Sequence, residues 1–546
     1  MPQYVGIDLG TTYSCIAYLD ENDVSKITRN KEGEEETPSV VLFDNNQKAI
    51  VGSTAKRQAI LYPNTCMRFF KRDMGEEDLK YDINGEQMKP QKISSFVLLK
   101  LKKDFESEHG CVLNNVVITV PAYFGLAETN ATQEAGRIAG FDNVITLPEP
   151  VAASIAYGLM NADSGERNIV VYDLGGGTFD STILNINGNT FTVKGITGNK
   201  FLGGKDWDDT LVGIIAEKLV EGGDSGKSKS ELLSDPQIAL DLSLEAEVLK
   251  RELSSENVTE VQGTYRIGLV PIGFTITREE FEEKTKHLIG QTIDLLDEAI
   301  IKAGMTIKDI DEIVLVGGST RMPQVGNAIR QKYPGAKYRM FEPSQAVAKG
   351  AAIYAKFGCV YVPSPSPIPT PPGQDSQGGK GISEKPIILN RALSKTFGVL
   401  ALIEENGTEK ERVSNIIFRN AKLPATNERA YYPSRDKQSQ VEVEVFENDT
   451  YYDKTNATTE SASRVTPIEM SSKIGSFLID LPSPSEVSRN DEICVLFNAA
   501  ADGTLYSKVT FKGQSWDKNF DISSGVSMSE EEIEEERNKV GLCYKG

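Results

Sequence analysis

Two short stretches of the sequence place aspartate and glycine directly after an apolar run. One is YDLGGGTFD at 172–180, and the other is IDLGTTYSC at 7–15. Glycine lets backbone N–H groups approach a phosphate with no Cβ in the way, and successive N–H groups form a nest for an anion. Either stretch alone also fits an ordinary hairpin turn, since Asp and Gly favour turns. The recurrence predicts two related halves, each with a phosphate-binding hairpin.

The donors of these hairpins suit a polyphosphate lying between them. Asp8 and Asp173 precede the glycines, where a carboxylate would repel a phosphate. Their natural partner is a hydrated Mg²⁺, held by one or two carboxylates and by phosphate oxygens. The alternative is that each aspartate only caps its own turn. The sequence contains no GxxxxGK[ST], which excludes a P-loop enzyme. The candidate phosphate contacts are Gly10, Thr11, Thr12, Gly175, Gly176 and Thr178.

Two further stretches could hold a nucleoside. In EIVLVGGSTRMPQV (312–325), an apolar run ends in Gly317, Gly318 and Ser319, whose backbone could lie flat against a base or ribose. In EVLKRELSS (247–255), four polar residues share one helical face. That face could hydrogen-bond a ribose and stack a guanidinium on a purine. It could equally be a solvated surface, the more common role of a polar helix face. Its residues are Glu247, Lys250, Arg251 and Ser254.

The composition limits the functional classes. The net charge of −20 over 546 residues disfavours binding to nucleic acid or to an anionic membrane, which both need a positive field. Only two histidines are present, which excludes a His-rich metal site, and six scattered cysteines fit a reducing compartment. The N-terminus does not resemble a signal peptide, and no run of 18 apolar residues occurs. We therefore expect a cytoplasmic protein that binds neither nucleic acid nor membrane.

The pattern of apolar runs divides the chain into four parts. In residues 1–358, runs such as NVVITV and NIVVYDLG alternate with helical stretches, which indicates an α/β domain. Residues 359–390 are rich in Pro, Ser and Gly and end in the apolar segment PIILN, as expected of a linker. Residues 391–525 alternate as β-strands do. Residues 526–546 predict a solvated helix of two to three turns, capped by Ser529.

Together, these motifs resemble the nucleotide-binding domain of the heat-shock protein 70 (DnaK-type) chaperones. The stretches GIDLGTTYSC, VPAYF, PEPVAASIAYG, VYDLGGGTFD, FLGGKDWDD and LVGGSTRMP occur in that family's order and spacing over residues 3–358. The region after the linker is similar, more weakly, to the family's substrate-binding domain. The resemblance implies an α/β fold with a two-lobed actin/hexokinase-type ATPase domain, followed by an all-β sandwich domain and a short C-terminal helix stub.

The resemblance also implies roles for single residues. Catalysis would rest on Lys71, Glu149, Asp8, Asp173 and Thr178, with Lys71 reaching the γ-phosphate and orienting the attacking water. This fits a reaction that depends on positioning and electrostatics. Asp8, Asp173 and Asp180 would organise Mg²⁺ and K⁺. The implied nucleotide contacts are Gly10, Thr11, Thr12, Tyr13, Gly175, Gly176, Gly204, Glu247, Lys250, Arg251, Ser254, Gly317, Gly318, Ser319 and Arg321.

The implied activity is slow hydrolysis of ATP to ADP and phosphate by a stress-response chaperone that assists protein folding. The implied cofactors are ATP/ADP, Mg²⁺ and K⁺. The implied partners are a J-domain co-chaperone, a nucleotide exchange factor, and unfolded or nascent polypeptides. The alternative is a nucleotide-binding co-chaperone or exchange factor for a full-length relative. A sugar kinase or an actin-like filament protein would share the ATPase fold but not the sandwich after an apolar linker, and fold alone does not decide function.

The ATPase domain departs from the family pattern at three places. The family usually has Asn at position 125 and an arginine at position 129 that helps to couple the domains, where this chain has Gly125 and Thr129. Pro121, the expected switch proline, is retained. Ser344 replaces an aspartate near the nucleotide. The Pro-rich insertion also lengthens the connection to PIILN, which lowers the effective concentration of the docking partner. We expect weakened coupling between the domains.

The predicted substrate domain departs as well. Tyr431, Tyr432 and Val441 match the family's peptide-binding positions, although the tyrosines could equally be ordinary core residues. The predicted loop EENGTEKERVSN carries Glu404 and Glu405 where the family has apolar residues that cover the peptide, and burying charge is costly. The helical lid is nearly absent. We therefore expect peptide binding to be weak and rapidly reversible.

Overall fold

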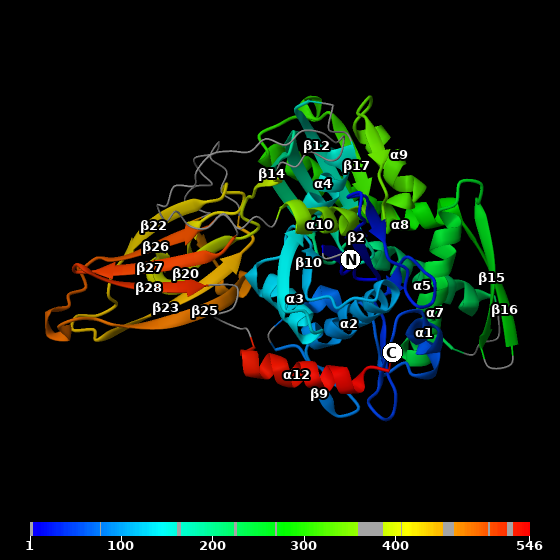
Figure 1. Cartoon of the computed structure of the whole chain (residues 1–546), viewed down its shortest axis with the longest axis horizontal. Helices are drawn as coiled ribbons and strands as arrows, with labels where there is room; N and C mark the ends of the chain where they lie inside the picture. The colour runs from blue at the N-terminus through cyan, green and yellow to red at the C-terminus, as the bar shows by residue number, and fades with distance from the viewer. Residues whose placement is uncertain are drawn as a thin grey trace.

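The computed structural model describes residues 4–76, 78–160, 165–222, 227–267, 270–358, 386–405, 407–450, 464–500, 503–520 and 528–545. The Pro-rich insertion predicted at 359–385 lies outside these ranges. Within them, a two-lobed α/β domain is followed by a β-sandwich and a C-terminal helix, so the predicted fold class is confirmed (Figure 1). Among the helices of the described ranges, none combines the length and apolar character needed to cross a bilayer.

The α/β domain is built on two sheets of related topology. The strands of the first lobe are β1 (Val5–Asp8), β2 (Tyr13–Leu19), β3 (Ser25–Ile27), β4 (Thr37–Pro38), β10 (Asn115–Val120) and β11 (Asn143–Pro148). Those of the second lobe are β12 (Arg167–Leu174), β13 (Phe179–Asn187), β14 (Thr190–Asn199), β17 (Glu312–Val316), β18 (Tyr338–Met340) and β19 (Ile388–Asn390). The orders are β11-β10-β1-β2-β3 and β18-β17-β12-β13-β14-β19. In both, the first strand of an antiparallel hairpin pairs with a parallel strand, which bears out the predicted related halves.

Two helices pack against each other between the sheets, α4 (Glu149–Met160) and α10 (Ala346–Phe357). Their crossing depends on Gly350, because a Cβ there would lie 1.7 Å from the carbonyl oxygen of Ala152. Helix α10 also lies directly on β1, where a Cβ on Gly6 would be 2.2 Å from the backbone nitrogen of Ala352. Backbone atoms in a close-packed core have little room to withdraw. Glycine at these two positions therefore allows α4, α10 and β1 to pack this closely.

Replacing Gly350 by alanine should destabilise the α/β domain. The added methyl group would overlap the Ala152 carbonyl, and overpacking of this kind costs roughly 1–3 kcal/mol. Gly290→Ala is the matched control: Gly290 lies in helix α8 (Arg278–Lys302), and no atom lies within 4 Å of a Cβ added there. Alanine should leave that helix unchanged or stabilise it by about 1 kcal/mol. Thermal unfolding followed by circular dichroism measures both variants, and equal midpoints would contradict this account of the crossing.

The remaining helices and strands complete each lobe. The first lobe adds β5 (Val41–Phe43), β6 (Ala49–Val51), β7 (Cys66–Met67), β8 (Tyr81–Ile83), β9 (Glu86–Met88), α1 (Ser53–Gln58), η1 (Ala59–Leu61), η2 (Phe70–Asp73), α2 (Pro90–His109) and α3 (Leu126–Ile138). The second adds α5 (Gly204–Glu221), α6 (Lys229–Ser234), α7 (Pro236–Leu253), β15 (Glu260–Ile267), β16 (Val270–Thr277), α8, η4 (Ile307–Asp309), η5 (Gly318–Arg321) and α9 (Pro323–Lys332).

The C-terminal β-domain is a sandwich of two antiparallel sheets. One has the order β24-β21-β20-β23-β25 and the other β22-β26-β27-β28, with an apolar core between them. The first sheet contains β20 (Thr396–Glu405), β21 (Thr408–Ile417), β23 (Gln440–Asn448), β24 (Val465–Thr466) and β25 (Ser471–Asp480). The second contains β22 (Ala425–Tyr431), β26 (Ile493–Ala499), β27 (Leu505–Phe511) and β28 (Gln514–Phe520). Two short 3-10 turns, η6 (Ile468–Met470) and η7 (Pro484–Glu486), connect the strands.

The prediction that EENGTEKERVSN forms a loop is wrong. Its described residues continue β20 and β21 into one long hairpin, in which Glu404 stands opposite Glu409. Glu405 forms an ion pair with Arg412 at 3.0 Å. The sequence of this segment does not show that its two halves pair with each other as β-strands. The carboxylates therefore belong to the end of a hairpin.

The C-terminal helix packs on the first lobe and is not a solvated helix, contrary to the prediction. Helix α12 (Glu530–Cys543) is 14 residues long and lies against α2 and α3 (Figure 1). Ile533 and Val540 are buried in the core of that lobe, and Glu536 pairs with Lys92 at 2.6 Å. The predicted cap is confirmed, since the Ser529 hydroxyl accepts a hydrogen bond from the backbone N–H of Glu532. Ile533 and Val540 are seven positions apart, a spacing that puts them on one helical face.

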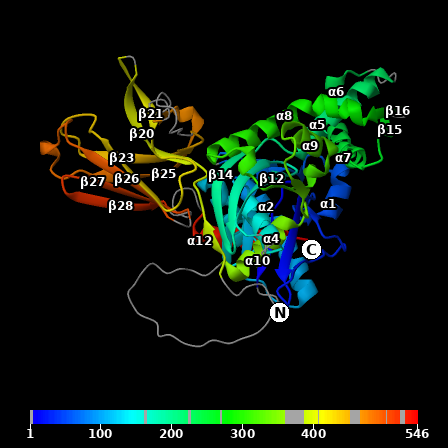
Figure 2. The ribbon, with the colours of Figure 1, turned by 90° about the horizontal axis from the view of Figure 1, so that it is seen from above.

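The β-sandwich contacts the α/β domain along the edge where β14 lies (Figure 2). Strand β19, part of the predicted apolar segment PIILN, pairs in parallel with β14. The backbone N–H of Ile387 donates to the carbonyl of Phe357 at 3.0 Å, which links this segment to the end of α10. The apolar segment is therefore bound to the second lobe rather than extended between the domains.

Candidate functional site

The two Asp-Gly hairpin turns meet between the lobes. A Cβ on Gly176 would lie 2.0 Å from Oγ1 of Thr12, and a Cβ on Gly177 would lie 2.3 Å from Cγ2 of Thr11. The close approach of the turns therefore requires glycine at both positions. Because β1–β2 and β12–β13 come from the two related halves, the fold itself brings the repeated stretches face to face.

A cleft of about 680 Å³ opens between the lobes at these turns. Gly204 and Asp180 lie behind its wall. The backbone N–H of Gly204 donates to the carbonyl of Gly175 at 2.9 Å, and Asp180 is paired with Asp173 across the hairpin strands. The other predicted residues of the nucleotide site line the cleft: Asp8, Gly10, Thr11, Thr12, Tyr13, Lys71, Glu149, Asp173, Gly175, Gly176, Thr178, Glu247, Lys250, Arg251, Ser254, Gly317, Gly318, Ser319 and Arg321.

A buried ion pair joins η2 to the start of α4 in this cleft. The Nζ of Lys71 lies 2.5 Å from Oε1 of Glu149, and both side chains are less than a tenth exposed. Within a low-dielectric site, such a pair holds a charged ammonium group in one place. Lys71 therefore presents a fixed positive charge next to the hairpins.

Arg72, which the sequence analysis did not single out, ties the first lobe to the second hairpin. Its Nε donates to the carbonyl of Gly177 at 2.7 Å, and its guanidinium pairs with Asp206 at 2.6 Å. Asp206 in turn accepts a hydrogen bond from the backbone N–H of Gly203. The only available signal was its position next to Lys71 in FFKRDMG.

Three aspartates gather at the base of the hairpins. Burial, followed by the charge of Glu149, raises the pKa of Asp8 to about 7, against the opposing effect of Lys71. Burial and Glu149 also raise the pKa values of Asp173 and Asp180 well above the ordinary range. Both carboxylate oxygens of Asp180 are buried, and no side chain of the described residues donates a hydrogen bond to them. A buried carboxylate that is costly to ionise and has no side-chain partner fits a nearby cation with its bound water.

The arrangement suits a hydrated cation. Within the described ranges, no three His, Cys, Asp or Glu side chains converge on a common position for a metal ion. Mg²⁺ commonly keeps several waters and binds one or two carboxylates together with substrate phosphates. Asp8 and Asp173 at the surface of the cleft, with Asp180 behind them, fit a site of that kind.

An ion-pair network bridges the mouth of the cleft. Lys56 of α1 donates to Oε2 of Glu247 at 2.6 Å and to the Tyr13 hydroxyl at 2.7 Å, and that hydroxyl donates to Oε1 of Glu247 at 2.8 Å. We call Tyr13, Lys56 and Glu247 the cleft latch. Burial alone would raise the pKa of Glu247, but Lys56, Arg251 and the hydrogen bonds lower it to about 2. Glu247 is therefore an ionised link between the lobes. Lys56 belongs to no recognisable motif and was missed.

The rest of the polar face on α7 is also engaged. Lys250 pairs with Asp208 at 2.8 Å and donates to the carbonyl of Gly204 at 2.9 Å. Asp208 lines the cleft and was not predicted, although it belongs to the quoted stretch FLGGKDWDD. Arg251 lies over the Tyr13 ring, 4.7 Å from its centroid. The solvated-surface alternative is thus wrong for Glu247 and Lys250.

The strand end at Gly317 also requires glycine. Its φ is 83°, and a Cβ would lie 2.5 Å from Oδ1 of Asp173. The departure at position 344 adjoins this segment, because the Arg321 guanidinium donates to Oγ of Ser344 at 3.3 Å. The serine therefore still contacts a residue that lines the cleft.

A second cavity, of about 1400 Å³, lies on the β-sandwich. It is lined by the predicted residues Tyr431, Tyr432 and Val441, and also by Glu404 and Glu405. The Tyr431 hydroxyl donates to Oγ of Ser414 at 2.9 Å, and burial raises the pKa of Tyr431 to about 12. Tyr432 is 58% exposed and so is not a core residue. The alternative of ordinary core packing therefore applies to Tyr431 at most.

Comparison with known proteins agrees with this geometry. Residues 4–84 and 76–360 match the family model described as Hsp70 protein. The chain is also 34% identical over 536 residues to the chaperone protein DnaK of Thermosipho melanesiensis. The alignment covers 97% of this chain and 81% of that relative. The opposed hairpins, the lysine–glutamate pair and the following β-sandwich occur together in one chain that these matches span. The protein belongs to the Hsp70 family.

Proposed function

We propose that this protein is an ATP-dependent chaperone that assists protein folding and hydrolyses ATP slowly in the cleft between its lobes. The observation that carries the proposal is the buried pair of Lys71 and Glu149, which lies beside two opposed glycine hairpins. Membership in the Hsp70 family supports ATPase and chaperone activity. The alternative of a nucleotide-binding co-chaperone or exchange factor is not favoured by those matches.

The hairpins would bind the phosphates of ATP. Backbone N–H groups and the hydroxyls of Thr11, Thr12 and Thr178 can donate to phosphate oxygens, and the glycines leave the approach open. Asp8, Asp173 and Asp180 would hold Mg²⁺ through its water, with K⁺ as a second proposed cation. The bound Mg²⁺ would neutralise phosphate charge during hydrolysis.

The catalytic side chains would orient water against the terminal phosphate. Lys71, fixed by Glu149, would place its ammonium group on the γ-phosphate oxygens, where negative charge must be stabilised. Glu149 and Asp173, which are buried and line the same cleft, would accept hydrogen bonds from the attacking water. Positioning and electrostatics then supply most of the rate enhancement.

The residues on the opposite wall would hold adenosine. Arg251, whose guanidinium lies over the Tyr13 ring, lines this wall and would stack on the base, and Gly317, Gly318 and Ser319 would offer backbone at close range. The cleft latch closes over this end of the cleft. Its three side chains would have to separate before nucleotide leaves.

Replacing Lys56 by methionine should accelerate nucleotide release. The change removes both hydrogen bonds of Lys56 in the latch, and a loss of about 1.4 kcal/mol would increase the dissociation rate of ADP roughly tenfold. Stopped-flow release of a fluorescent ADP analogue measures the rate. Lys31→Met, at an exposed position outside the cleft, is the control. Equal release from the two variants would show that the latch does not retain nucleotide.

The β-domain would bind extended segments of unfolded or nascent polypeptide in its cavity, with Tyr431, Tyr432 and Val441 as contacts. The acidic hairpin end beside them makes weak and rapidly reversible binding our expectation. A J-domain co-chaperone and a nucleotide exchange factor are the proposed partners. We also propose a cytoplasmic location.

Single-turnover hydrolysis of ATP with Mg²⁺ and K⁺ tests this function. We expect slow basal turnover that accelerates when an apolar peptide or a J-domain protein is added. Tight ATP binding without turnover, or turnover indifferent to both additions, would contradict the proposal and favour the co-chaperone alternative.

A further inference from the structure

The β-domain places one carboxylate on the end of a helix in the ATPase domain. Oε2 of Glu447, near the end of β23, accepts a hydrogen bond from the backbone N–H of Leu126 at 2.9 Å. Leu126 is the first residue of α3, and Glu447 is 4% exposed. A carboxyl oxygen at a helix N-terminus satisfies an otherwise unpaired N–H group. The β-domain thus caps a helix of the other domain.

Gly125 makes room for this cap. A Cβ at position 125 would lie 2.3 Å from Oε1 and 2.5 Å from Oε2 of Glu447. Any other residue there would have to displace the carboxylate. Gly125, which departs from the family pattern, therefore leaves the space that the Glu447 carboxylate occupies. Thr129, the other departure, lines a cavity of about 110 Å³ next to Pro121 and Leu393.

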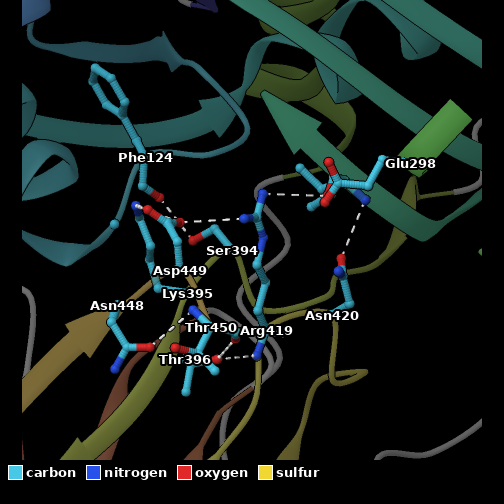
Figure 3. A network of polar contacts seen from close by, with 12 residues as sticks. Phe124, Glu298, Ser394, Lys395, Thr396, Arg419, Asn420, Asn448, Asp449 and Thr450 are labelled. Atoms are coloured by element: carbon cyan, nitrogen blue, oxygen red, sulfur yellow. Dashed lines mark hydrogen bonds and ion pairs between the residues drawn. The ribbon is translucent and has the colours of Figure 1, made fainter. Parts of the chain in front are cut away.

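Charged groups from two other segments face Glu447. Glu128 of α3 faces it with a like charge while accepting a hydrogen bond from the backbone N–H of Gly125 at 3.0 Å. Lys395, which precedes β20, faces it with an opposite charge and is itself paired with Asp449 at 2.9 Å. Figure 3 shows Lys395 and Asp449 beside Ser394, whose hydroxyl donates to the carbonyl of Phe124 at 2.8 Å.

A second contact, from the other lobe, flanks the cap. The Arg419 guanidinium donates to the carbonyl of Ile196 at 3.4 Å, and Oδ1 of Asn420 accepts from the backbone N–H of Ile196 at 3.3 Å (Figure 3). Arg419 also pairs with Asp449 at 3.3 Å. The β-domain therefore contacts both lobes at once, and two of its residues, Ser394 and Glu447, reach the segment that follows Pro121.

We propose that Glu447 is the positioning residue that couples the two domains of this chain, by capping α3, which begins at Leu126 shortly after Pro121 and contains Thr129 where the family has an arginine. The proposal rests on the proposed function, because it concerns the coupling of the same ATPase and peptide sites.

The surroundings of Glu447 also make the contact between the domains depend on pH. Burial, followed by the like charge of Glu128, raises its pKa to about 7, while Lys395 and the amides of Leu126 and Ala127 act in the opposite direction. In the separated domains, the carboxyl would titrate near its ordinary value of 4.5. Docking is therefore favoured as the pH falls through 7 and is weakened above it. Glutamine keeps an acceptor oxygen for Leu126 but cannot titrate.

Hydrogen exchange and small-angle X-ray scattering of the full chain with ATP test the proposal. In Glu447→Ala, the amides at the start of α3 should exchange at least roughly tenfold faster, because they lose their acceptor. Gly125→Ala should do the same, and the double variant should show a strongly non-additive effect. Glu444→Gln, on the same strand and paired with Lys473 within the β-domain, should behave as wild type.

The pH profile separates coupling from a merely structural role. The docked fraction of the wild type, measured by scattering, should fall as the pH rises from about 5 to 7, and Glu447→Gln should stay docked without this dependence. An unchanged exchange rate in Glu447→Ala, or a pH profile retained in Glu447→Gln, would overturn the proposal. Because ATP binding and basal hydrolysis are measured on the same samples, their loss in the wild type would instead count against the proposed function.

Discussion

Replacing Lys71 by methionine should lower the single-turnover rate of ATP hydrolysis by roughly 10²–10³-fold. The lysine supplies a fixed positive charge in a low-dielectric cleft, 2.5 Å from Glu149, and methionine keeps much of its length without the charge. ATP should still bind, because the glycine hairpins and the α7 wall are untouched. Rapid-quench hydrolysis and equilibrium ATP binding, measured on the same preparation, report the two quantities.

The same change should also cost stability. Without Lys71, the Glu149 carboxylate is left buried and unpaired, which typically destabilises a protein by about 3–5 kcal/mol. The double variant Lys71→Met/Glu149→Gln should recover stability but not hydrolysis. Lys103→Met, at an exposed position on α2, is the control for the loss of a lysine. Hydrolysis at a wild-type rate in Lys71→Met would contradict the catalytic role.

Replacing Gly203 by alanine should reduce hydrolysis roughly 10²-fold by moving a hairpin rather than by removing a functional group. A Cβ at position 203 would lie 2.4 Å from the carbonyl carbon of Gly177 and 2.5 Å from the backbone nitrogen of Thr178. Since these are backbone atoms, the second hairpin must shift as a whole. ATP binding should weaken as well, and titration with a fluorescent ATP analogue measures both effects together with the hydrolysis assay.

Gly213→Ala, within α5, the helix that Gly203 directly precedes, is the control for Gly203→Ala. An added Cβ there meets only the flexible end of Lys229, at 3.3 Å, so ATP binding and hydrolysis should be unchanged. If Gly203→Ala behaved like this control, the position of the second hairpin would not limit catalysis.

The parts of the site that could be predicted are those built from short contiguous stretches. The Asp-Leu-Gly hairpins and the strand end at Gly317 carry their signal within a few residues, and the fold brings the two hairpins together through its internal symmetry. The cleft latch could not be predicted in this way. Lys56 and Glu247 are far apart in the sequence, and nothing in either segment indicates that they form an ion pair.

The domain interface was the least predictable part of the fold. Thr129 and the long linker suggested weakened coupling, and the space that Gly125 leaves for the Glu447 carboxylate became apparent only in the structure. The C-terminal helix was predicted to be solvated because it is rich in glutamate. Only two of its apolar residues, Ile533 and Val540, are buried in the core of the first lobe. Both features depend on contacts between distant segments, which local sequence patterns do not encode.

The most direct test of the central claim is the dissociation rate of a short fluorescent apolar peptide from the full chain, measured with ADP and then with ATP. The account predicts release at least about tenfold faster with ATP, because nucleotide in the cleft and peptide on the sandwich communicate through the docked interface. Equal rates under conditions where ATP is shown to be bound would contradict it.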